Sequence, residues 1–208
     1  MQFITHLTNH ISWDQLKHCA VNGVLDEVLC SGDRFMIRLN NDRDAVIVAT
    51  KDQSGKWYFL FQDCLDSERR YNVRNTTEGG WRDSIIRRWM NSDGLALLPN
   101  ELREIIIPAR NVQVLNGERI ITQDMMFLPS YTQVFGGDRF AEQEPEDSKL
   151  EYFETFRERI AGRNGVPACW WLRSVFSGTV ACFVHGYGSA GGNGAGGSYG
   201  VRPLSLIG

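Results

Sequence analysis

The amino-acid sequence predicts a single-domain α+β protein with short antiparallel strands, two or three helices and long loops. Short runs of β-branched and aromatic residues are separated by clusters of Asn, Asp and Gly, which is typical of antiparallel strands joined by turns. A few other segments place apolar residues at helical spacing. The 208 residues contain no repeat and no Pro/Ser-rich linker, so a single hydrophobic core is the simplest arrangement.

The first predicted element is a helix over about residues 13–21. Ser12 and Gln15 form a capping-box pattern directly before it, in which each side chain can bond the backbone N–H of the other residue. We interpret residues 1–30 as a helical lead-in to a domain that covers residues 31–208.

Three apolar runs follow and predict an antiparallel meander, because each run ends in turn-forming residues. They cover residues 35–39, 45–49 and 57–62. The segment Trp81 to Met90 then places its apolar side chains on one helical face, and Asn91 to Gly94 is expected to stop this helix.

The second half of the chain has weaker signals. A single helical turn is predicted after Pro99, and Asn116-Gly117 predicts a hairpin between two extended runs. The acidic block at 142–149 is expected to be exposed. Apolar residues at helical spacing then predict a last helix over about 150–160.

Composition and charge exclude several functional classes. The formal net charge is −3, so bulk electrostatics do not favour nucleic acid as a partner. No apolar run is long enough to span a membrane. The N-terminal residues have neither a basic region nor an apolar segment typical of a secretory signal. We therefore expect a chain that is cytoplasmic when made, and display on a virion or cell surface stays open.

The cysteines and histidines predict neither a disulfide framework nor a metal or other cofactor. The five cysteines are scattered without a C-x-x-C pair, which favours free, mostly buried thiols in a reducing compartment. His6 and His10 have the i, i+4 spacing of helical metal ligands, but no cysteine pair completes a ligand set. We interpret them as exposed polar residues.

The C-terminal forty residues carry the strongest signal. Nine of the 23 residues from Gly178 to Gly200 are glycine. Glycine density alone is typical of a flexible loop. Bulky apolar and aromatic residues are interleaved with these glycines, however, and apolar segments that each contain an arginine flank them. An ordered, exposed surface is therefore the alternative interpretation.

The residue types absent from this segment are also informative. Val175 to Tyr199 contains no Lys, Glu, Gln, Met or Trp, although these five types make up 35 of the 208 residues. Every type that is present can be encoded by a codon ending in a pyrimidine. This is the set that results when the first two bases of asparagine codons are randomised.

Two motifs resemble a known family. The first is GGW-x-x-S-x-x-R-x-W-x-N from Gly79 to Asn91, and the second is WWLRS at 170–174 followed by GVRP at 200–203. Together they resemble bacterial and phage domains of unassigned function with a C-type-lectin-like fold, related to formylglycine-generating-enzyme-type domains. The sequence also resembles the variable proteins of diversity-generating retroelements, whose C-terminal lectin-like region is hypermutated. The resemblance covers about residues 30–207.

The resemblance implies a structural frame and a displayed ligand-binding surface. The frame residues are Trp81, Trp89, Trp170, Trp171, Arg173 and Arg202. The implied ligand-binding residues are Val175, Phe176, Thr179, Ala181, His185, Tyr187, Gly191, Asn193 and Ala195. An arginine in an apolar segment is either an anchor that satisfies buried acceptors or an anion site. No Asp or Glu occurs from Ala168 onward, which argues against a lectin-type calcium site there.

Three functions follow as hypotheses. The first is a recognition module for a protein or glycan ligand. The second is a structural component of a phage or a surface appendage. The third is a cysteine-dependent enzyme of the formylglycine-generating type that would use Cys169 and Cys182. The apolar neighbours of both cysteines argue against the third, because apolar burial raises the pKa of a thiol. The oligomeric state stays open.

Overall fold

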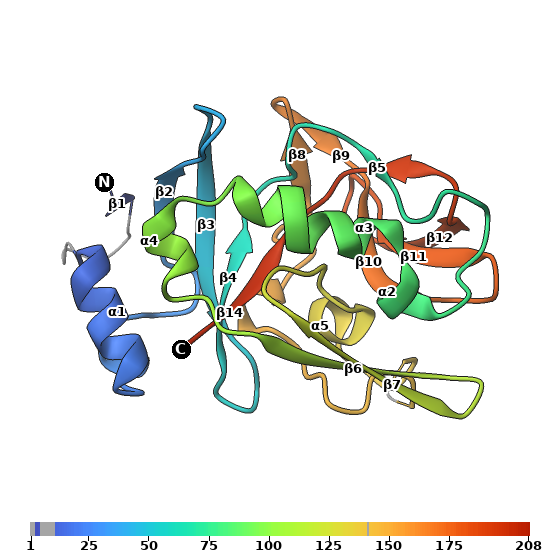
Figure 1. The fold of residues 1–208 in the computed structure, drawn as a ribbon, viewed down its shortest axis with the longest axis horizontal. Coiled ribbons are helices and arrows are strands. Elements are labelled where there is room, and N and C mark those ends of the chain that lie inside the picture. Colours follow the sequence, from blue (N-terminus) through green and yellow to red (C-terminus); the bar gives the residue numbers. More distant parts are fainter. Residues whose placement is uncertain (1–2, 5–10, 141) are drawn as a thin grey trace.

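The largest element of the computed structural model is a five-stranded antiparallel sheet in the order β1-β2-β3-β4-β14 (Figure 1). Its strands are β1 (Phe3–Ile4), β2 (Arg34–Arg38), β3 (Asp44–Lys51), β4 (Trp57–Phe61) and β14 (Leu204–Ile207). The structure describes residues 3–4, 11–140 and 142–208. The predicted meander is confirmed as β2, β3 and β4, and the C-terminal strand returns to pair with β4.

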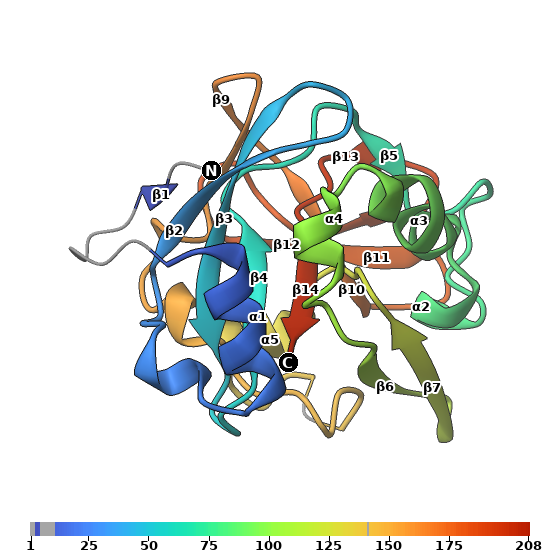
Figure 2. The same ribbon diagram turned by 60° about the vertical axis from the view of Figure 1, so that its left-hand side comes forward.

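The predicted N-terminal helix is confirmed as α1 (Trp13–Val21), with a complete capping box between Ser12 and Gln15. Leu16 and Ala20 of α1 are buried in the same hydrophobic cluster as the main sheet. The 3₁₀ turn η1 (Leu25–Glu27) connects α1 to the meander. The lead-in helix therefore packs on the common core (Figure 2). The histidine pair at 6 and 10 lies outside the described residues.

A second, smaller sheet holds the C-terminal segment. Its order is β10-β11-β12, with β10 (Trp170–Val175), β11 (Val180–Val184) and β12 (Ala190–Gly194) all antiparallel. The remaining strands of the described residues form three two-stranded ribbons. They pair β6 (Ala109–Leu115) with β7 (Glu118–Asp124), β8 (Ala161–Arg163) with β9 (Val166–Ala168), and β13 (Ser198–Tyr199) with β5 (Arg69–Arg70).

The predicted hairpin at Asn116-Gly117 is confirmed. It joins β6 to β7, and both turn residues have positive φ, as a two-residue hairpin turn requires. The predicted turn after Pro99 is confirmed as α4 (Asn100–Arg103). The remaining regular helix is α5 (Tyr131–Phe135), which has a capping box between Ser130 and Gln133.

The prediction of one continuous helix from Trp81 to Met90 is wrong. The segment forms two short helices, α2 (Gly80–Asp83) and α3 (Ile85–Trp89), separated at Ser84. Ser84 is extended, and its hydroxyl accepts the N–H of Arg87 and so caps α3. Residues 91–94 do not stop the helix either, because α3 continues into the π-helical turn η2 (Met90–Gly94).

The helix predicted over 150–160 is also wrong. Only the 3₁₀ turn η3 (Glu151–Phe153) forms there. The carbonyls of Glu158 and Arg159 accept hydrogen bonds from Arg202 and Trp170. The N–H of Thr155 donates to Glu158 Oε2 and that of Arg157 donates to Thr155 Oγ1, so these two groups are not available for the backbone hydrogen bonds of a continuous helix.

The structure confirms the predicted class, an α+β domain of mostly short antiparallel strands with few helices. None of the helices in the described residues is long and apolar enough to cross a membrane.

Candidate functional site

Arg173 of β10 is completely buried beside two carboxylates. Its Nη2 donates to Asp147 Oδ2, whereas Nε and Nη1 have no partner among the described residues. Glu144 is buried next to it and accepts hydrogen bonds from Thr132 and Ser174. Burial raises the pKa of Glu144, and the nearby Arg173 opposes this effect. The sequence left two roles open for Arg173, a structural anchor or an anion site, and its pairing with Asp147 favours the anchor.

The expectation that the whole 142–149 block is exposed is wrong at Glu144. This side chain is buried because α5 and β10 supply its hydrogen-bond donors.

Arg202 is also completely buried, but its partners are carbonyls and aromatic rings. Nε donates to the carbonyl of Phe61 and Nη1 to that of Glu158, both at 2.9 Å. Its guanidinium carbon lies 5.0 Å from the ring centroid of Trp170 and 5.3 Å from that of Phe153. Burial lowers the pKa of Arg202. This arginine therefore links the end of β4, the 154–160 segment and β10.

The first sequence motif is organised around Asp124, a residue that sequence reasoning missed. Asp124 is buried at the end of β7 and accepts from Trp81 Nε1 at 2.9 Å, Arg87 Nε at 2.6 Å and Asn91 Nδ2 at 3.1 Å. Its remaining donors are Asn111 Nδ2 and Thr122 Oγ1. The Trp, Arg and Asn of the motif therefore share one carboxylate, which ties α2 and α3 to the β6–β7 ribbon.

The other frame tryptophans differ in burial. Trp170 and Trp171 are completely buried, and each indole N–H donates to a backbone carbonyl. Trp89 is half-buried instead, and the guanidinium carbon of Arg69 lies 3.5 Å from its ring centroid. Such a stack is a favourable cation–π contact.

The structure divides the nine expected ligand-binding residues into two groups. Exposed or half-buried are Phe176, Thr179, His185, Tyr187, Gly191 and Asn193. Val175, Ala181 and Ala195 are buried, so the expectation that they are displayed is wrong. The physical reason is the 72–79 segment, which packs over this part of the sheet through hydrogen bonds from Asn72 N to Ala195 O and from Thr77 N to Gly178 O.

The exposed residues lie at two turns and along the strand between them. Phe176 and Thr179 lie in the turn between β10 and β11, whereas His185 and Tyr187 lie in the turn between β11 and β12. These two turns are at opposite ends of β11, because its five residues run from one turn to the other. Gly191 and Asn193 lie between the turns on β12, opposite Phe183 and Ala181 of β11.

A row of aromatic rings connects the core to the turn between β11 and β12. The ring centroids of Trp171 and Tyr199 are 4.7 Å apart, and those of Tyr199 and Phe183 are 4.6 Å apart. The ring centroids of Phe183 and His185 are 4.5 Å apart. His185 stacks on Tyr187 with a centroid distance of 4.8 Å and an interplanar angle of 11°. The row ends at Tyr187, which is 66% exposed.

Glycines in β12 make room for these rings. A Cβ at Gly191 would lie 2.7 Å from the ring of Phe183 and 2.8 Å from Nε2 of His185. The next residue on that side, Asn193, is exposed and donates from Nδ2 to the hydroxyl of Tyr199 at 2.8 Å. We call His185, Tyr187, Asn193 and Tyr199 the aromatic patch. Sequence reasoning missed Tyr199, whose ring pairs with Phe183 across chain segments.

The cysteines named for an enzymatic function lie in poor surroundings for a nucleophile. Cys182 is buried, and burial raises the pKa of its thiol to about 12. Such a thiol stays protonated at neutral pH, whereas the thiolate is the reactive form. Cys169 is half-buried in the short connection between β9 and β10. In the residues that the structure describes, no three His, Cys, Asp or Glu side chains gather into a metal site.

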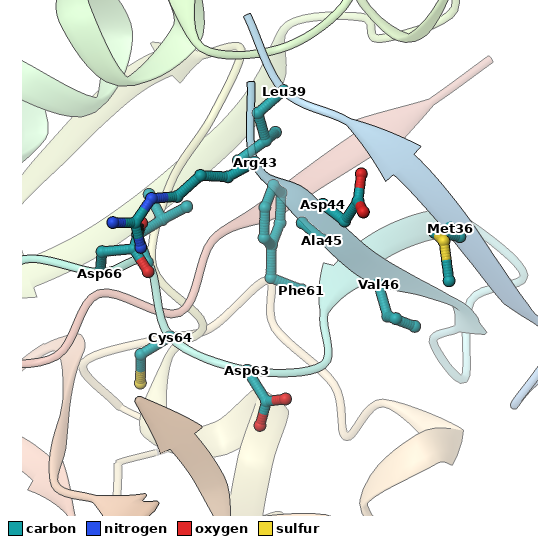
Figure 3. Close-up of a pocket in the computed structure, with 11 residues that line it drawn as sticks. Met36, Leu39, Arg43, Asp44, Ala45, Val46, Phe61, Asp63, Cys64 and Asp66 are labelled. Carbon is teal, nitrogen blue, oxygen red and sulfur yellow. Dashed lines mark ion pairs between the residues drawn. The ribbon is translucent and has the colours of Figure 1, made fainter. Parts of the chain in front are cut away.

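The hollows outside the aromatic patch include a small one and a large one. The smaller one, of about 180 Å³, lies beside β3 and β4 (Figure 3). Arg43 pairs there with Asp66 at 2.5 Å, Asp63 accepts the N–H of Gly162, and burial raises the pKa of Cys64 to about 12. Arg43, Asp66 and Asp63 therefore already have partners, and the thiol of Cys64 stays protonated at neutral pH. The larger hollow, of about 950 Å³, lies beside Phe176.

A family model matches residues 54–207 of the chain, which include the Gly79–Asn91 motif, the frame and the aromatic patch. The comparison with curated proteins finds no match, and neither does the comparison with solved structures. The match covers more than half of the chain. The chain therefore belongs to the family described as "Domain of unknown function (DUF6273)".

Proposed function

We propose that this protein is a recognition module that binds a protein or glycan ligand through the aromatic patch. The observation that carries the proposal is the stacked pair of His185 and Tyr187, which is held at the surface by a row of rings that begins in the core. Rigid aromatic side chains give a large contact area at a low entropic cost, and small residues around them allow close approach. Glycines and Asn193 supply those surroundings here.

The chemistry of the patch fits a neutral or weakly polar ligand. Imidazole, phenol and amide groups can donate and accept hydrogen bonds beside the ring faces. No Asp or Glu follows Ala168 in the chain, so the segments of the patch add no carboxylate. The ring faces can stack on a sugar ring or pack against apolar side chains of a protein.

The finer fold and the origin of the segment are part of this proposal. The two motifs and the second sheet inserted before the returning strand β14 support a C-type-lectin-like arrangement. The missing residue types support a variable protein of a diversity-generating retroelement. The neighbouring DNA tests this origin. We expect a near-copy of the codons for 170–203, with adenines at the differing positions, and a reverse transcriptase gene nearby. Absence of both contradicts it.

The binding proposal is tested by screening the labelled protein against a glycan array and a random peptide library displayed on phage. We expect hits that Tyr187→Ser and His185→Ser each weaken by about tenfold or more, because aromatic anchors carry much of an interface's energy. Val21→Ser is the matched control, since Val21 is an exposed apolar residue on α1. Hits that survive both patch variants, or a screen without hits, would overturn the proposal.

A further inference from the structure

The larger hollow is a cleft between α2, the β6–β7 hairpin and the turn that joins β10 to β11. Its volume is about 950 Å³, and four segments of the chain line it, since Glu142 and Gln143 also contribute. Figure 1 shows the β6–β7 hairpin extending away from the body on the same side as α2. The cleft lies at the β10–β11 end of β11, whereas His185 and Tyr187 of the aromatic patch lie at the other end.

The charged side chains that line the cleft are mostly acidic. They are Glu78, Asp83, Glu118 and Glu142, together with the single base Arg82. Arg82 and Asp83 neutralise each other through two hydrogen bonds of 3.0 Å. No ion pair within the described residues involves Glu78, Glu118 or Glu142. A concave surface with charges of one sign concentrates counter-charged ligands.

The cleft also has an apolar component. Phe176 contributes to one wall and is 54% exposed, and Leu115 and Ile120 of the hairpin contribute to another. The guanidinium carbon of Arg139 lies 5.3 Å from the ring centroid of Phe176, so this cation already occupies one face of the ring. The exposed part of the ring remains available to an apolar side chain.

Gln143 also lines the cleft, but its Oε1 is buried and has no donor among the described residues. The groups open to a ligand are therefore the free carboxylates and the exposed part of the Phe176 ring. Carboxylates favour a ligand that carries N–H donors with a positive charge.

We propose that this cleft binds a segment of a partner protein that carries two basic side chains on either side of an apolar residue. Glu78 projects from the α2 side, and Glu118 projects from the hairpin side, so carboxylates on two walls can each receive a basic side chain. The apolar residue packs on Phe176. This interaction goes beyond the proposed function of the aromatic patch and uses none of its residues.

Fluorescence anisotropy with a labelled peptide Gly-Arg-Leu-Arg-Gly tests the proposal, with Gly-Glu-Leu-Glu-Gly as the charge-reversed probe. We expect saturable binding of the basic peptide only. The triple variant E78Q/E118Q/E142Q should weaken binding by about tenfold, since it removes the carboxylates that pair with the two arginines of the peptide, and two exposed ion pairs together contribute up to about that much. Phe176→Ser should weaken it by a smaller factor, and Tyr187→Ser should have no effect because it lies at the other end of β11.

The matched control is E27Q/E101Q/E154Q, which changes net charge by the same amount at three exposed glutamates outside the cleft. Equal weakening by the two triple variants would mean attraction by net charge alone and would overturn the proposal. So would no saturable binding at low ionic strength. If the cleft triple variant fails to fold in a thermal melt, the three single variants replace it, and unchanged affinity in all three counts against the cleft.

Discussion

The structural frame and the aromatic patch come from the same part of the chain but differ in how their side chains are held. Arg173, Arg202 and Trp171 are completely buried, and each one donates hydrogen bonds to atoms far away in sequence. Tyr187 is largely exposed to solvent, and its ring stacks on that of His185. Residues with many partners fix the backbone, whereas a residue with few partners can be exchanged at little cost in stability.

The strands show the same contrast. All six residues of β10 are buried, because both faces of that strand are covered. In β12, only two strands away, every residue is exposed or half-buried. A single small sheet thus joins a buried strand to an exposed one. A buried strand is expected to tolerate substitution less well than an exposed one, and the following predictions test whether the two regions differ in this way.

The largest effect is expected at Asp124, where the contrast with the patch is greatest. Asp124→Ala removes one carboxylate that serves Trp81, Arg87 and Asn91, so it leaves buried donors and a partly buried cation unpaired. We expect a loss of about 3–5 kcal/mol in the free energy of unfolding, measured by urea denaturation. Asp124→Asn keeps the shape and some acceptors and should lose less. A loss below about 1 kcal/mol for Asp124→Ala would contradict the frame assignment.

The two buried arginines should come next and should differ from each other. Arg173→Ala and Arg202→Ala are each expected to cost about 2–4 kcal/mol. With methionine in place of alanine, Arg202 should be the milder site, because methionine keeps the contacts with Trp170 and Phe153 and leaves no buried carboxylate unpaired. Arg173→Met leaves Glu144 and Asp147 without their cation.

Arg173→Met should also change the dependence of stability on pH. Burial raises the pKa of Glu144 above its unfolded value, and removing Arg173 raises it further. A group whose pKa is raised by folding stabilises below its unfolded pKa, and this contribution is lost as pH rises through the folded pKa. The deficit of Arg173→Met relative to wild type should therefore shrink between pH 7.5 and pH 5. A deficit that grows over this range would mean that Glu144 is not the affected group.

Local sequence signals predicted the elements whose determinants are local. The capping-box pattern of Ser12 and Gln15 predicted the start of α1, and Asn116-Gly117 predicted the turn between β6 and β7. Both predictions are confirmed. The errors have local and distant causes. Ser84 divides one predicted helix by a local cap. In the other, the side chains of Thr155 and Glu158 take backbone N–H groups that a helix would use. Distant donors from Arg202 and Trp170 then hold the carbonyls of this segment, and no local pattern shows them.

The same limit applies to the candidate site. The alternation of residues in β11 and β12 indicates which side chains share a face, but not whether that face is covered. Ala195 is buried because Asn72, more than a hundred residues earlier, pairs with it. The partner of the first motif, Asp124, ends a strand without any distinguishing signal. Chemistry-bearing residue types were visible in the sequence, and their burial was not.

The smallest effect is expected at the exposed ends of β11. Tyr187→Ser should change the free energy of unfolding by no more than about 0.5 kcal/mol, because the side chain is 66% exposed. Phe176→Ser should behave in the same way at the other end, since its ring is 54% exposed. His185→Ser should cost somewhat more, because the imidazole covers Phe183 and lies over Gly191. Thermal melts of the three single variants decide this before any ligand is known. If Tyr187→Ser lowers the melting temperature as much as Arg202→Ala does, Tyr187 belongs to the frame, and the difference between a fixed frame and an exchangeable patch does not exist.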